Sequence, residues 1–130
     1  MIPVNGLLDV ADYIVAQYTK VKVGTGGSPT SFSDSELDSF VAEKTVVPSV
    51  NRASGTISWV AEFSGSDIGN EGVAELGIFK ASNDASNDTL LSRVTFTNTG
   101  VLASADTLTF TIEMEMAWWV VEQTLISLVN

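Results

Sequence analysis

Cysteine and histidine are both absent from this chain of 130 residues. Without cysteine the protein has no disulfide bonds, no thiolate nucleophile and no thiolate metal ligand. Without histidine it lacks the usual general base near neutral pH and the commonest ligand for zinc and copper. The remaining chemistry is that of oxygen atoms and a few amines, so the sequence predicts a protein that is not an enzyme, has no cofactor and takes no small-molecule substrate.

Positive charge is also scarce. Six Lys and Arg residues stand against sixteen Asp and Glu residues, and the formal net charge is -10 at pH 7. Such a surface repels nucleic-acid phosphates and anionic lipids, which argues against both as partners. The N-terminus has no basic region and carries Asp9 and Asp12, which argues against a signal peptide. The composition also permits a halophilic host.

Hydrophobic patterning predicts a mainly β fold. Hydrophobic residues make up 45% of the chain, and its length suits one domain. Residues 55–63 and 107–116 alternate apolar and polar side chains with the period of a half-buried strand. Shorter strands are predicted at 20–23, 44–50, 73–79 and 89–96, the last two as a long-looped hairpin. Residues 1–116 are therefore predicted to form an antiparallel β-sandwich or jelly-roll-like domain.

Helical structure is predicted at two places before the middle of the chain. Residues from about 5 to 18 have apolar side chains at helical spacing, and Asn5 is placed to cap this N-terminal helix. Ser33 and Glu36 have the spacing of a capping box, which predicts a short helical turn over residues 34–40. The glycines between residues 24 and 27 lack the lysine of a phosphate-binding loop, so they indicate a turn.

The C-terminal segment, residues 117–130, is strongly apolar but contains Glu122 and is too short to cross a bilayer. Burying one large apolar side chain contributes about 1.5 to 3 kcal/mol, so these side chains should be covered. The cover is either the domain's own core, with the segment as a last strand or helix, or a neighbouring subunit. In a strand, adjacent tryptophans would point to opposite faces, which favours a subunit interface. The predicted interface residues are Trp118, Trp119, Val121, Leu125, Ile126, Leu128 and Val129.

Acidic side chains suggest two kinds of site, and the sequence supports neither strongly. Calcium takes oxygen ligands such as those of the loop 81–88, but the spacing does not match an EF-hand. We therefore predict no metal site, and we interpret this loop as a solvated hairpin tip. If the loop does bind calcium, Asp84 and Asp88 are the candidate ligands. Glu113 and Glu115 have a spacing that could serve glycoside hydrolysis, but neighbouring threonines indicate a solvent-exposed face.

Two long segments resemble a known class of protein. Residues 75–112 contain a glycine-centred strand with the sequence LGIF. A polar loop leads from this strand to the segment TLLSR, and a later strand is introduced by SADTLT. Residues 18–37, YTKVKVGTGGSPTSFSDSEL, are similar to the start of the same pattern, in which an opening helix is followed by a strand and a V-G-T-G loop that leads to a short acidic helix. In order and spacing these segments resemble virion structural proteins of tailed viruses, whether of bacteriophages or of archaeal viruses. The chain departs from the pattern in the longer loop at residues 81–88 and in the apolar tail after Met116.

The resemblance implies a non-enzymatic subunit located in the virion. It implies a homo-oligomer that also binds other virion proteins, in the head as a decoration or turret protein or in the neck, tail or fibre. The alternative from another class is a carbohydrate-binding β-sandwich module, in which Trp59, Trp118 or Trp119 would stack on sugar rings. Against this alternative, Trp59 lies on the predicted core side of its strand.

Overall fold

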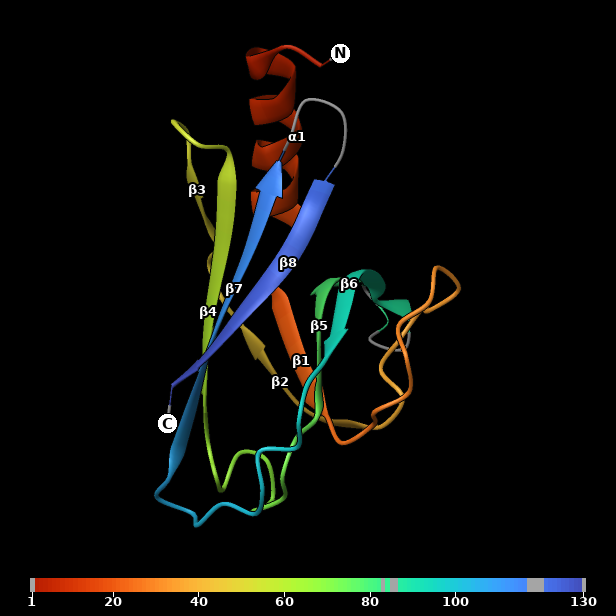
Figure 1. The fold of residues 1–130 in the computed structure, drawn as a ribbon, viewed down its shortest axis with the longest axis vertical. Helices are drawn as coiled ribbons and strands as arrows, with labels where there is room; N and C mark the ends of the chain where they lie inside the picture. The colour runs from red at the N-terminus through yellow and green to blue at the C-terminus, as the bar shows by residue number, and fades with distance from the viewer. Residues whose placement is uncertain (1, 83, 85–86, 117–120, 130) are drawn as a thin grey trace.

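The computed structural model describes residues 2–82, 84, 87–116 and 121–129, and within them eight strands form two antiparallel sheets (Figure 1). The first sheet has the strand order β2-β1-β5-β6, and the second has the order β3-β4-β7-β8. This arrangement confirms the predicted mainly β sandwich with one N-terminal helix. The elements are α1 (Val4–Gln17), β1 (Lys20–Gly24), β2 (Phe40–Thr45), β3 (Ser49–Asn51), β4 (Thr56–Ser64), β5 (Glu75–Lys80), β6 (Thr89–Thr95), β7 (Thr107–Met116) and β8 (Val121–Val129).

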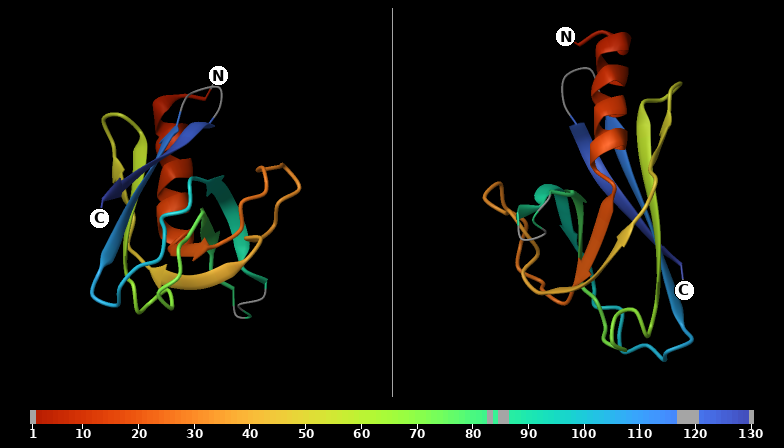
Figure 2. Two further views of the ribbon diagram at one scale, coloured as in Figure 1. Left: turned by 60° about the horizontal axis from the view of Figure 1, so that its bottom comes forward. Right: turned by 180° about the vertical axis from the view of Figure 1, so that it is seen from behind.

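Helix α1 and the first sheet lie one above the other against the same face of the second sheet (Figures 1 and 2). Ala11 and Ile14 enter the core, while Asp12 faces solvent. The prediction that Asn5 caps this helix was wrong, because Asn5 lies inside the first turn. The N-cap residue is Pro3, whose fixed φ suits the start of a helix. Among the described residues, no helix has both the length and the apolar character needed to cross a membrane.

The core forms where the alternating strands of the second sheet meet the first sheet and α1. On β4, alternate side chains are fully buried, and β7 repeats the pattern on the neighbouring strand. The rings of Phe63 and Phe110 pack edge to face across these two strands, with centroids 6.0 Å apart. The period-two patterns of residues 55–63 and 107–116 are therefore confirmed for the described side chains. The buried core residues of the two strands are Ile57, Trp59, Ala61, Phe63, Leu108, Phe110, Ile112 and Met114.

No helical turn forms over residues 34–40, so the predicted capping box was wrong. The backbone N–H of Ser31 donates to the carboxylate of Asp34, and the backbone N–H of Ser28 donates to that of Asp38. Carboxylates that bind loop amides in this way hold the backbone in turns and compete with a helix.

The C-terminal segment provides the last strand of the second sheet over residues 121–129. β8 pairs with β7 in a register that sets Ile126 opposite Ile112 and Leu125 opposite Glu113. Residues 117–120 and 130, with the candidate interface residues Trp118 and Trp119, lie outside the described residues, as do the side chains of β8. The predicted interface role of this segment stays a prediction.

Candidate functional site

The β1–β2 loop, residues 25–39, folds over the outer face of the first sheet, and as a result β5 is buried on both sides. Leu76 and Ile78 belong to the main core. On the other face, a Cβ atom added to Gly77 would contact Leu37 of the loop and Leu90 of β6. The loop thus covers this face of the sheet as a further layer would, and it forms a projection beside β6 (Figure 1).

Glu75 fixes this loop to the sheet. Its side chain is fully buried, and its carboxylate accepts hydrogen bonds from the backbone N–H groups of Gly26, Asp38 and Ser39, at 2.8, 2.9 and 2.8 Å. The Nε of Arg93 donates to the same carboxylate at 3.0 Å. One carboxylate therefore holds both ends of the β1–β2 loop.

Arg93 extends the contact into an ionic cluster, which we define as Asp34, Asp38, Glu75 and Arg93. Its two terminal nitrogens form ion pairs with Asp34 at 3.2 Å and with Asp38 at 3.0 Å, and one of them also donates to the carbonyl of Ser28. Hydrogen bonds from Ser28, aided by the Arg93 charge, hold the pKa of Asp38 below its usual value. Burial would lower the pKa of Arg93, but its acidic partners outweigh burial and raise it.

Glycine is required at positions 24 and 26, because the two ends of the β1–β2 loop and the Glu75 carboxylate approach each other closely there. A Cβ atom on Gly24 would lie 2.3 Å from the carbonyl oxygen of Ser39, and one on Gly26 would lie 2.5 Å from Oε2 of Glu75. Neither atom can be accommodated without moving the loop or the buried carboxylate. The V-G-T-G segment, interpreted from sequence as a turn, therefore also provides the space in which the β1–β2 loop docks.

The segments that carry the resemblance meet in the ionic cluster. Gly26 and Asp34 come from the upstream segment, Glu75 precedes the LGIF strand, and Arg93 closes TLLSR. Sequence reasoning missed Glu75 and Arg93 as a pair. The signal that could have identified them is that Glu75 and Arg93 each stand beside apolar residues, in a chain that has only six basic residues to pair with its acidic ones.

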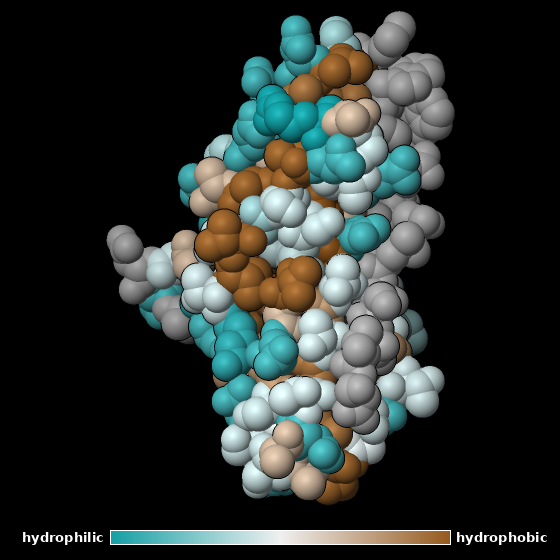
Figure 3. Space-filling model, turned by 90° about the vertical axis from the view of Figure 1, so that its left-hand side faces the viewer, coloured by the Kyte–Doolittle hydropathy of each residue, from teal (hydrophilic) through white to brown (hydrophobic). Residues whose placement is uncertain are grey.

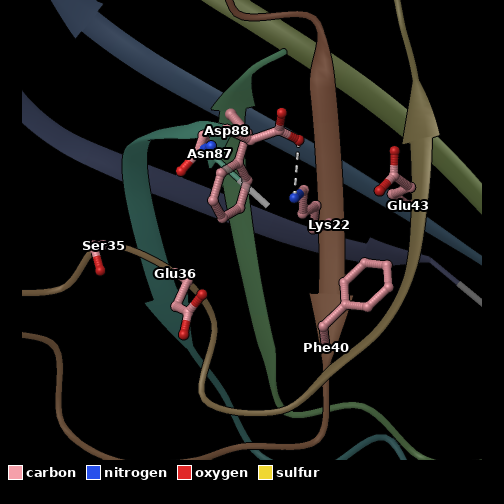
Figure 4. A pocket seen from close by; sticks show the side chains of 8 residues that line it. Lys22, Ser35, Glu36, Phe40, Glu43, Asn87 and Asp88 are labelled. Carbon is pink, nitrogen blue, oxygen red and sulfur yellow. Dashed lines mark ion pairs between the residues drawn. The ribbon is translucent and has the colours of Figure 1, made fainter. Parts of the chain in front are cut away.

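A second group of charges lines a pocket of about 560 Å³ between the β1–β2 loop, the strands β1 and β2, and the connection from β5 to β6 (Figure 4). Asp88 bonds to two amines there, with Nζ of Lys20 at 2.8 Å and Nζ of Lys22 at 3.0 Å. Nζ of Lys22 also lies 4.4 Å from the ring centroid of Phe79. Burial would raise the pKa of Asp88, but hydrogen bonds from Lys20, Ser82 and Lys22 hold it well below its usual value.

The structure therefore gives the two candidate metal ligands other partners. Asp88 lies between two ammonium groups, and Asp84 accepts a hydrogen bond from the side-chain amide of Asn87 at 3.0 Å. Among the described residues no group of three or more acidic side chains is positioned to hold a metal ion.

Replacing Asp88 by asparagine is expected to lower the free energy of unfolding by about 1 to 3 kcal/mol at neutral pH, because Lys20 and Lys22 lose their shared carboxylate. The folded pKa of Asp88 is lowered, so its contribution is present above about pH 4 and is lost as the pH falls toward the folded pKa. Thermal unfolding at pH 7 and pH 2.5 should show a smaller difference between wild type and Asp88→Asn at the lower pH.

Glu36→Gln is the matched control, since Glu36 is an exposed residue on the rim of the same pocket. It should leave the unfolding temperature at pH 7 almost unchanged. An equal loss in both variants would mean that the lysine pairs of Asp88 contribute nothing specific.

The candidate residues for sugar chemistry are not brought together. Trp59 is fully buried, and its indole Nε1 donates to the carbonyl oxygen of Tyr18 at 2.8 Å, so its ring is not available to a sugar. Glu113 and Glu115 lie on the exposed face of β7, as the neighbouring threonines indicated. Trp118 and Trp119 lie outside the described residues.

Apolar side chains are also found on the surface. On the side where β3 and β4 lie, they form separate patches among hydrophilic side chains (Figure 3). Elsewhere the most exposed of the large apolar residues in the described chain is Phe32, in the β1–β2 loop. Comparison of the chain with protein-family models, with curated proteins and with solved structures finds no match.

Proposed function

We propose that the protein is a non-enzymatic structural subunit of a tailed-virus particle, where it assembles as a homo-oligomer with other virion proteins in the head, neck, tail or fibre. Its resemblance to such proteins supports the proposal. So does the arrangement of the second sheet, in which β8 forms a long edge with a single charged residue. This edge is the observation that carries the assembly part of the proposal.

The four edge strands differ in how well they are protected. Folded proteins limit pairing at sheet edges by short strands, charged residues or covering loops. β2 carries Glu43 and Lys44, β3 has three residues, and β6 lies beside the β1–β2 loop. β8 has nine residues, of which Glu122 alone is charged. Within the described part of the chain, β8 is therefore the edge best suited to receive a strand from another copy.

The register of β8 adds to this argument. Ile126 and Leu128 are paired with core residues of β7, as expected for a strand of the sandwich. Leu125 and Val129, however, are paired with Glu113 and Thr109, which belong to the polar face. Apolar residues at both kinds of register position are typical of a strand covered on two sides.

Placing lysine at both Leu125 and Val129 is expected to convert the oligomer to monomers with an unchanged circular dichroism spectrum, because both positions share the register of the polar face. Size-exclusion chromatography with light scattering measures the mass. The matched control adds two lysines to the edge strands of the first sheet, at exposed Thr45 and Thr95. A wild-type monomer, or an oligomer that survives in Leu125→Lys/Val129→Lys, would contradict the assembly role. Immunogold labelling of purified virus particles tests the virion location, and unlabelled particles would contradict it.

A further inference from the structure

The pocket beside Lys22 contains an aromatic ring that is only half covered by the protein (Figure 4). Phe40, at the start of β2, is 53% exposed, whereas Phe79 on β5 is fully buried. A half-exposed ring on a convex surface is ordinary, but Phe40 lines a hollow of about 560 Å³. Small-molecule sites have volumes of roughly 300 to 1,000 Å³. The Phe40 ring is therefore accessible to a small ligand that enters the pocket.

The inner wall of the pocket is held in place by ion pairs. The side chain of Asp88 is almost completely buried between the ammonium groups of Lys20 and Lys22. The Nζ atom of Lys22 lies 4.4 Å from the ring centroid of Phe79 and 5.6 Å from that of Phe40. Because these side chains are already ordered by one another, binding against them would cost little conformational entropy.

Hydrogen-bonding groups of both kinds surround the ring. The hydroxyl of Ser35 and the side-chain amide of Asn87 can each donate and accept, the carboxylate of Glu36 accepts, and the amine of Lys22 donates. Within the described part of the chain, the side chains of Ser35 and Glu36 form no hydrogen bond or ion pair. Both side chains are therefore available to a ligand.

The charges of the pocket favour a neutral ligand. Asp88 and Glu43 are paired with Lys20 and Lys22, which leaves Glu36 on the rim without a basic partner among the described residues. An anion would face Glu36, Glu43 and a chain with a net charge of -10. A cation would approach the ammonium group of Lys22. An uncharged ligand meets neither repulsion.

We propose that this pocket binds a neutral sugar, with one face of the sugar ring against Phe40 and its hydroxyl groups bonded to Ser35, Glu36 and Asn87. A pyranose has an apolar face of C–H groups that suits an aromatic ring. Its hydroxyl groups each donate and accept, as the mixed groups of the pocket require. The sugar is a ligand rather than a substrate. The site contains none of the tryptophans considered from the sequence, and sugar binding does not depend on the proposed assembly.

A glycan array tests the class of ligand. The labelled full chain is applied to an array that carries neutral oligosaccharides, sialylated oligosaccharides and oligosaccharides of glucosamine with free amines. Reproducible binding is expected to neutral glycans and to be weaker for the two charged kinds. The proposal would be overturned by an array without binding to any neutral glycan, or by binding to charged glycans that equals or exceeds it.

Phe40→Ala is expected to weaken binding of the neutral glycan with the strongest array signal at least tenfold, as measured by isothermal titration calorimetry. Phe40→Trp should retain binding, because it keeps a flat aromatic face at this position. Phe32→Ala is the matched control, since Phe32 is an exposed phenylalanine of the β1–β2 loop that does not line this pocket. Equal affinities of wild type and Phe40→Ala would overturn the proposal, as would an equal loss in Phe40→Ala and Phe40→Trp.

The double variant Ser35→Ala/Glu36→Ala tests the polar side of the pocket without touching its aromatic ring. Both residues are exposed, so the unfolding temperature should stay close to that of the wild type. The affinity for the same neutral glycan is expected to fall at least tenfold, whereas Glu62→Ala, on the second sheet, should leave it unchanged. If the double variant binds this glycan as tightly as the wild type, the sugar does not occupy this pocket and the proposal is wrong.

Discussion

Glu75→Gln is expected to lower the free energy of unfolding by about 3 to 5 kcal/mol. The substitution keeps the shape of the side chain but turns one of two accepting oxygens into a donor, which then faces the N–H groups of the β1–β2 loop. It also removes the buried counter-charge of Arg93. Urea denaturation measures the loss, and hydrogen exchange should be faster at the amides of Gly26, Asp38 and Ser39.

Glu62→Gln provides the control, because Glu62 is an exposed residue of β4 and should change stability by less than about 0.5 kcal/mol. The double variant Glu75→Gln/Arg93→Met is expected to be no less stable than Glu75→Gln alone, since it no longer holds a buried guanidinium that has lost its one fully buried counter-charge. If Glu75→Gln and Glu62→Gln unfold at the same urea concentration, the ionic cluster does not hold the loop.

Trp59→Ala is expected to cost about 3 to 5 kcal/mol, the usual range for removing a large aromatic side chain from a core. Trp59 is fully buried, and its indole N–H is bonded to the carbonyl oxygen of Tyr18, where α1 passes into β1. The change leaves a cavity and also leaves that carbonyl without its donor. Thermal and urea unfolding measure the loss.

Val60→Ala tests the same strand one residue further along. Val60 points to the opposite face of β4 and is 56% exposed, so its truncation should cost less than about 1 kcal/mol. Equal losses at positions 59 and 60 would contradict the register of β4, because a shift of one residue exchanges the two faces of a strand.

The strands with one buried face were predictable because their signal is local. In β4 and β7 each side chain reports its own environment, so alternation along the chain is enough to identify the core residues. β5 has no such alternation, since the β1–β2 loop buries its outer face. The capping-box prediction near Ser33 failed for a related reason: Asp34 and Asp38 bond to Arg93, which lies far along the chain.

The charged groups were less predictable than the apolar ones. Asp88 was recognised only as a loop carboxylate, because its partners Lys20 and Lys22 lie on β1. Glu75 and Arg93 are on neighbouring strands, but the amides that Glu75 binds belong to a loop much earlier in the chain. Such pairings depend on which strands become neighbours in the sheet, and the residues around each charged group do not indicate the strand order.

The strand order of the first sheet has a consequence for synthesis of the protein. β1 pairs with β2, the next strand in sequence, but on its other side it pairs with β5, which lies much later in the chain, and contacts between such distant segments form slowly. The β1–β2 loop leaves the ribosome early, but Arg93 is made much later, so the loop acquires its final shape only after Arg93 has emerged as well. Until then, the amides of the loop that bind Glu75 lack the arrangement that the finished ionic cluster gives them.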